Sequence, residues 1–97
     1  MSNGPLYFPR KTIAACFVDS IRQQVETSTK YLGPLVELEV GMSPLTAAIL
    51  MKAKKLGSLS ELRDLIGCKS IIINHLMREG EVVIWRADQP PRWRWVP

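Results

Sequence analysis

Glycines divide the second half of this chain into short segments. Gly57, Gly67 and Gly80 each follow a segment whose apolar residues recur at helical spacing. Glycine readily adopts the left-handed conformation that ends a helix, so this punctuation predicts three short helices rather than one long helix. Whatever fold the chain adopts must therefore connect short helices to the segment that follows Gly80.

The three predicted helices differ in how clearly the sequence marks their ends. The first spans residues 43–57 and begins with a Ser-Pro pair, which suits an N-cap and a first helical position. The second spans residues 58–67, where Ser58 and Glu61 have the spacing of a capping box. The third spans residues 68–80. Its expected buried side consists of Ile72, Ile73, Leu76 and Met77.

Residues 81–97 have the pattern of a β-hairpin. The runs "EVVIWRAD" and "RWRWVP" flank a "QPP" turn. In the second run, period-two alternation places Arg92 and Arg94 on one face and Trp93 and Trp95 on the other. Trp85 of the first run is expected to join this aromatic face, although the sequence does not determine the register. The arginines either lie against phosphates or only keep the hairpin solvated.

The first half of the chain predicts one helix and one short extended segment. Residues 10–32 contain no proline or glycine and carry an apolar stripe, and Gly33–Pro34 ends the helix. The stripe packs either on the same chain or on a second copy. "LVELEV" at residues 35–40 alternates apolar and acidic residues, as a half-exposed strand does, but its length also suits a linker.

Charge is distributed unevenly along the chain. Residues 1–51 carry equal numbers of basic and acidic side chains, whereas residues 52–97 carry nine basic and five acidic ones. The whole net charge of +4 therefore belongs to the second half, which suits a polyanionic partner there. An apolar content of 46% is that of one globular domain and excludes a disordered chain.

The sequence contains no catalytic or metal-binding pattern. No nucleotide-binding glycine loop or nucleophile–base pair is present, so we expect no enzyme activity and no cofactor. Cys16 and Cys68 are far apart and have apolar neighbours, which predicts two buried reduced thiols. With His75 they lack the close ligand pair of a metal site. The absence of a signal pattern or apolar span predicts a cytoplasmic protein without membrane contact.

Residues 43–97 resemble the winged helix–turn–helix domains of small bacterial and phage-type transcription regulators. The resemblance rests on "PLTAAIL" of the form P-x-x-x-x-I-L, on "LSELRDLIG", on "HL" in the third predicted helix and on "MREGEV" before the wing. It implies an α+β, mostly helical fold. Residues 43–97 would form the winged core, and residues 1–42 would add a helix and an extended segment for packing or dimerisation.

The resemblance also implies a function. A homodimer would bind double-stranded DNA sequence-specifically, with the third predicted helix in the major groove and the hairpin as a basic and aromatic wing. The alternatives are a merely solvated helix face and a winged module that binds protein through the Trp-rich hairpin or the N-terminal helix. The expected DNA-binding residues are Lys69, Ser70, Ile71, Asn74, His75 and Arg78 of the helix, and Arg86, Arg92 and Arg94 of the hairpin.

Overall fold

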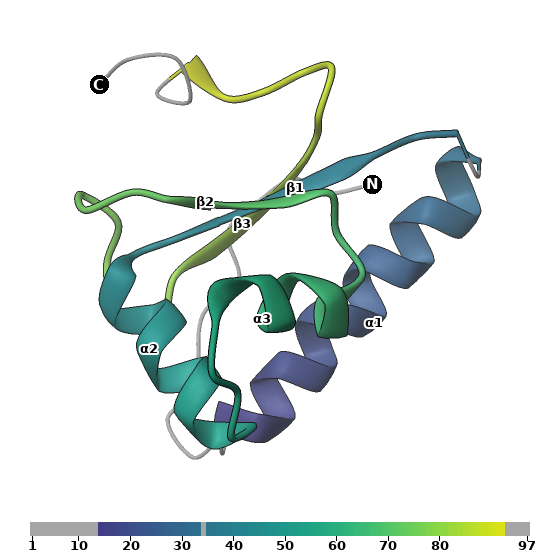
Figure 1. The fold of residues 1–97 in the computed structure, drawn as a ribbon. Coiled ribbons are helices and arrows are strands. Elements are labelled where there is room, and N and C mark those ends of the chain that lie inside the picture. The colour runs from purple at the N-terminus through teal and green to yellow at the C-terminus, as the bar shows by residue number, and fades with distance from the viewer. Residues whose placement is uncertain (1–13, 34, 93–97) are drawn as a thin grey trace.

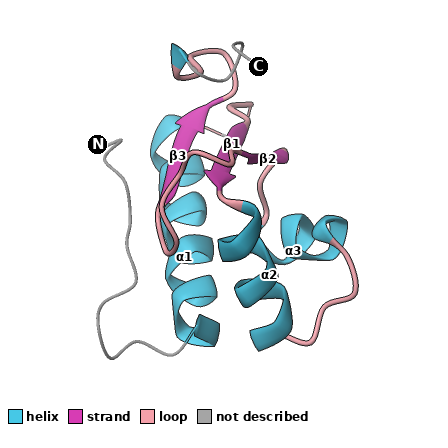
Figure 2. Ribbon diagram, turned by 90° about the vertical axis from the view of Figure 1, so that its left-hand side faces the viewer, coloured by secondary structure: helices cyan, strands magenta, loops and turns pink. Residues whose placement is uncertain are grey.

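The computed structural model describes residues 14–33 and 35–92, and this part of the chain has an α+β fold. Three helices lie on one side of a three-stranded mixed sheet (Figures 1 and 2). The elements follow in the order α1 (Ala14–Leu32), β1 (Leu38–Met42), α2 (Pro44–Ala53), α3 (Leu59–Ile66), β2 (Ser70–Ile73) and β3 (Val82–Arg86). In this part of the chain no helix is both long and apolar enough to cross a membrane.

The sheet is built around β1. Its strand order is β2-β1-β3, with β2 parallel and β3 antiparallel to β1. Val40 marks the centre of the register, opposite Ile71 on one side and Ile84 on the other. All five residues of β1 are buried; the strand has a neighbour on each side, and Leu38, Val40 and Met42 pack in the core with the helices. The sheet thus depends on a strand from the first half of the chain.

One hydrophobic core joins the helices to the sheet. Strand alternation turns Leu38, Val40 and Met42 of β1 toward the helices, and these side chains belong to the core. Helix α1 contributes Phe17, Val18, Ile21 and Val25, all of which are buried. The apolar stripe predicted for residues 10–32 therefore packs against the rest of the same chain, as far as the described residues 14–32 show.

Three of the four predicted helices are confirmed. Helices α1, α2 and α3 fall within residues 10–32, 43–57 and 58–67 respectively, although residues 10–13 lie outside the described part. The Ser58 and Glu61 side chains form the expected capping box, and Gly67 ends α3 with a positive φ of 83°. Propensity, capping and periodicity agree in these segments, so the sequence identified them correctly.

The prediction of a third helix over residues 68–80 was wrong. Ser70–Ile73 form strand β2, and residues 74–81 form a loop of turns before β3. The segment contains three successive isoleucines, whose β-branched side chains favour a strand when a neighbour can pair with it. β1 provides that neighbour, so tertiary pairing overrides the weaker helical periodicity.

The extended segments were predicted in part. "LVELEV" forms a strand rather than a linker, although the strand begins at Leu38 and continues to Met42. It pairs with β3, the first strand of the predicted hairpin. A turn follows β3, with the Gln89 N–H donating to the Arg86 carbonyl at 2.9 Å. Of the second predicted hairpin strand the structure describes only Arg92; residues 93–97, with Arg94 and Trp95, lie outside the described residues.

Candidate interaction surface

Within the described residues, strand β2 forms an open edge of the sheet. The Asn74 N–H donates to the Met42 carbonyl at 2.9 Å, which fixes the phase of the parallel ladder. Alternation then directs the backbone groups of Ser70 and Ile72 toward β1. Those of Ile71 and Ile73 face away from β1, at the edge of the sheet. This edge is a row of hydrogen-bonding groups on a strand that contains no charged residue or proline.

A shallow groove runs beside this edge on the helix side of the sheet. It has a volume of about 260 Å³ and lies between α3 and β2. Its lining residues are Leu59, Ser60, Arg63, Ser70 and Ile71. The half-buried Leu59 and Ile71 also pack against the core, so the groove has an apolar floor formed by ordered side chains.

The loop of residues 74–81 is fixed to the start of α2. The Gly80 N–H donates to Thr46 Oγ1 at 2.9 Å, and Thr46 is fully buried. Ser43 Oγ lies 2.8 Å from the same hydroxyl oxygen and caps α2 by accepting from the Thr46 N–H at 3.1 Å. This buried network holds the loop at the end of the sheet where β1 and β2 finish.

Two exposed leucines extend the apolar surface at this end. Leu76, in the loop that follows β2, is 93% exposed, and Leu45, in the first turn of α2, is 54% exposed. The sequence predicted Leu76 as a buried residue of a helix, and this was wrong because the helix does not form. Two further large apolar side chains, Tyr31 and Leu35, are exposed before β1 begins.

The structure separates the predicted DNA-binding residues. Lys69 lies at the start of β2, beside the beginning of β1, and Arg86 pairs in register with Leu38 at that same end. Asn74 follows β2 at the other end, where its N–H meets Met42. Ser70 and Ile71 are half-buried strand residues. These residues therefore do not share the face of one helix.

Two of the predicted DNA-binding cations, Lys69 and Arg86, form ion pairs with carboxylates. Lys69 Nζ lies 2.9 Å from Glu37 Oε2, and this hydrogen bond and charge raise the pKa of Lys69. Arg86 donates two hydrogen bonds to Asp88, at 3.1 and 2.9 Å. Both ion pairs are largely exposed and contribute little to stability, but they reduce the positive field that a phosphate would meet.

The remaining predicted residues lie in loops. Asn74 Oδ1 accepts from the Leu76 N–H at 2.9 Å and so stabilises a turn. His75 and Arg78 have exposed side chains, and the Arg78 N–H donates to Glu81 at 3.1 Å. Arg92 is exposed, and Arg94 lies outside the described residues.

Trp85 is buried with a carboxylate partner that the sequence did not reveal. It stands opposite Glu39 in the β1–β3 register, on the face of the sheet turned away from the helices. Its Nε1 donates to Glu39 Oε1 at 2.9 Å, and the two residues are only 4% and 6% exposed. Strand alternation indicated that Glu39 faces away from the core, but only the strand register identifies its partner.

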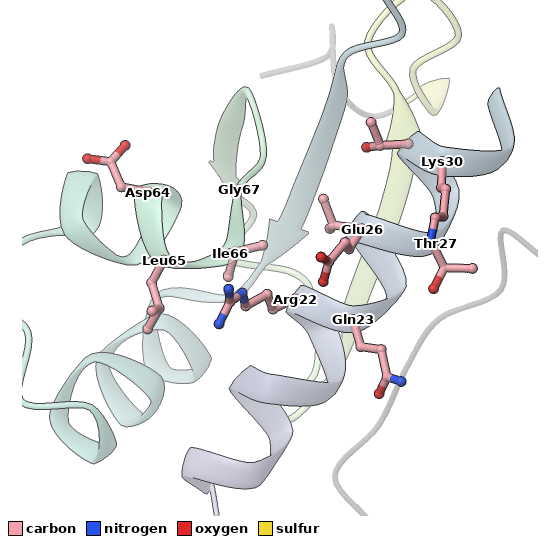
Figure 3. Close-up of a pocket in the computed structure, with 11 residues that line it drawn as sticks. Arg22, Gln23, Glu26, Thr27, Lys30, Asp64, Leu65, Ile66 and Gly67 are labelled. Atoms are coloured by element: carbon pink, nitrogen blue, oxygen red, sulfur yellow. The ribbon is translucent and has the colours of Figure 1, made fainter. Parts of the chain in front are cut away.

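A larger groove separates α1 from the C-terminal half of α3 (Figure 3). It has a volume of about 720 Å³. Arg22 and Lys30 on its rim are balanced by Glu26 and Asp64. Because opposite charges alternate around the groove, it offers no preference for an anion or a cation.

The two cysteines differ in their surroundings. Cys68, just before β2, is half-buried, and burial raises the pKa of its thiol to about 11. Cys16 is exposed on α1, so the prediction of two buried thiols was wrong for this residue. The described residues contain no group of three or more His, Cys, Asp or Glu side chains arranged to hold a metal ion.

Comparisons with known proteins assign no family to this fold. No family model, no curated protein and no solved structure matches the chain.

Proposed function

We propose that this protein is a protein–protein interaction module that binds an extended polypeptide along the open edge of β2. The observation that carries this proposal is the uncharged edge strand, on which the backbone groups of Ile71 and Ile73 point outward. A strand added there gains main-chain hydrogen bonds, and the groove lined by Leu59 and Ile71 accepts one of its side chains.

The described residues give this edge little protection against pairing. Stable monomers shield such edges with lysine, proline, a bulge or a covering element. Among the described residues, β2 has none of these between Ser70 and Ile73, and its length of four residues is the protection that remains; the adjacent Lys69 is ion-paired with Glu37. The exposed Leu76 continues the apolar surface just beyond the strand. An unprotected edge of this kind supports a binding role.

Electrostatics favours a polypeptide partner over nucleic acid. The described residues carry all nine acidic side chains of the chain but lack three of its thirteen basic ones, so this part is nearly neutral. Four of its cations are ion-paired: Lys54, Arg63, Lys69 and Arg86. DNA binding depends mainly on unpaired cations that neutralise phosphates.

Site-specific photo-crosslinking tests this proposal. A photoreactive residue at Ile72 should give a polypeptide adduct in extracts of the native host, whereas the same residue at the exposed Leu35, outside the strand, should not. The purified partner should then bind the unmodified protein at least tenfold more tightly than the Ile72→Lys variant, because a lysine opposes strand pairing at an edge. Equal binding by both proteins would refute the proposal.

Sequence-specific DNA binding as a homodimeric transcription regulator is the second candidate. Two observations favour it. Residues 54–58, which contain Gly57, connect α2 to α3, so that the two helices follow each other as in a helix–turn–helix motif. Three of the four excess positive charges, on Arg10, Lys11 and Arg94, lie in segments outside the described residues, and Arg94 stands between two tryptophans. Under this candidate α3, rather than residues 68–80, would be the helix that enters the groove.

Fluorescence anisotropy with mixed-sequence duplex DNA separates the two candidates. A DNA-binding protein should show an affinity that falls steeply as salt rises. Replacing Arg10 and Lys11 by alanine should weaken this binding, while Arg86→Ala should leave it unchanged because Asp88 already pairs with Arg86. No binding at low salt would exclude the second candidate and leave the first intact.

A further inference from the structure

We propose that the polypeptide that occupies the β2 edge is a second copy of this chain, with the two β2 strands antiparallel about a two-fold axis. This inference rests on the proposed function: it names a second copy of the chain as the polypeptide that the β2 edge binds. The result would be a continuous sheet of six strands, with β2 of each copy at its centre.

The backbone at the edge determines the register of such a pair. Only Ile71 and Ile73 present outward N–H and C=O groups, and an antiparallel ladder requires outward groups on both strands. The register that pairs both outward residues of each copy places Ile71 of one copy opposite Ile73 of the other, and the two-fold axis repeats this contact. The axis passes between the two Ile72 residues. These form a non-hydrogen-bonded pair, the type whose side chains approach most closely.

The side chains are compatible with this register. On the helix side, Ile73 of the second copy lies beside Ile71 and the groove between α3 and β2, where Leu59 extends the apolar contact. On the other face, the two Ile72 side chains meet, and Ser70 stands opposite Asn74. No pair within the strand places two like charges opposite each other, which is the usual obstacle to self-pairing.

The other edge of the sheet is less suited to a symmetric pair. The Ala87 N–H donates to the Glu37 carbonyl at 2.9 Å, which fixes the phase of the antiparallel ladder. Val82, Ile84 and Arg86 therefore present their backbone groups outward on β3. This outward-facing set includes a charged residue, whereas that of β2 is entirely apolar. β2 is accordingly the edge that we assign to the second copy.

Charge reversal on the two-fold axis tests the inference. The chain has a mass of 11.0 kDa, so light scattering should give twice this value for the unmodified protein. Ile72→Lys and Ile72→Glu should each halve the mass, because each variant places two like charges opposite each other. Mixed in equal amounts, the two variants should recover the dimer. Leu35→Lys, a matched charge at a 94% exposed site outside the strand, should remain dimeric.

Cross-linking provides a second test that does not require a charge in the strand. In a chain with Cys16→Ser and Cys68→Ser, an Ile72→Cys substitution should form an intermolecular disulfide, because paired Cα atoms across a non-hydrogen-bonded site lie within disulfide range. Leu35→Cys in the same background should not.

The outcomes also separate this inference from the proposed function. An unmodified chain that stays at 11.0 kDa at high concentration overturns self-association, as do variants at Ile72 that remain dimeric. The proposed function survives the first of these results if Ile72 still cross-links to another protein. It fails, together with the inference, if Ile72 cross-links to no polypeptide at all.

Discussion

At the scale of single residues, the two thiols should react differently. Burial raises the pKa of Cys68 from 9.0 to about 11, which reduces its thiolate fraction at neutral pH about a hundredfold. Iodoacetamide should therefore modify the exposed Cys16 well before Cys68, as read by mass spectrometry of the native protein. Unfolding in urea should remove the difference. Equal rates in the native state would show that Cys68 is not buried.

The same pKa shift links stability to pH. Between about pH 9 and 11 the unfolded chain releases the Cys68 proton while the folded chain retains it. The contribution of this thiol to stability is therefore fully present below pH 9 and is lost as the pH rises through that window. In the Cys68→Ser variant the free energy of unfolding should fall less between pH 9 and 11 than it does in the unmodified protein. Urea titrations of both proteins across this range would measure the effect.

At the scale of elements, local signals predicted the helices well and the site poorly. The ends of α3 are set by Ser58, Glu61 and Gly67 through contacts within a few residues. Both ends can therefore be predicted from the sequence. β2 differs because its conformation depends on β1, some thirty residues earlier in the chain. The run of isoleucines at 71–73 was the available signal, since β-branched residues favour strands. The open edge itself follows only from the strand order.

Proline substitutions can test whether residues 70–73 form a strand. The Ile72 N–H faces β1 and that of Ile71 faces outward, so proline should disrupt the ladder at position 72 but not at position 71. Relative to alanine at the same site, Ile72→Pro should cost at least about 1 kcal/mol more than Ile71→Pro. Urea unfolding in dilute solution measures both. In a helix, proline at either position would cost about 3 kcal/mol, so equal large losses would contradict the strand.

At the scale of the whole molecule, β1 joins the two halves of the chain. It lies between β2 and β3, which have no ladder with each other, and α1 adds the fully buried Val18 and Ile21 to the core. The sequence suggested a core in residues 43–97 with an added N-terminal segment. Hydrophobic periodicity identified α1 as amphipathic, but it does not specify which elements its apolar face contacts or that β1 is central.

Fragment complementation tests this dependence. A fragment of residues 43–97 should show no cooperative thermal transition by circular dichroism, because its two strands lack the neighbour that completes their hydrogen bonds. A peptide of residues 14–42 added to it should restore a folded spectrum. The same peptide with Val40→Asp should fail, since that fully buried position faces the helices. Cooperative folding of residues 43–97 alone would mean that β2 and β3 can pair without β1. That result would contradict the central position of β1 in the sheet.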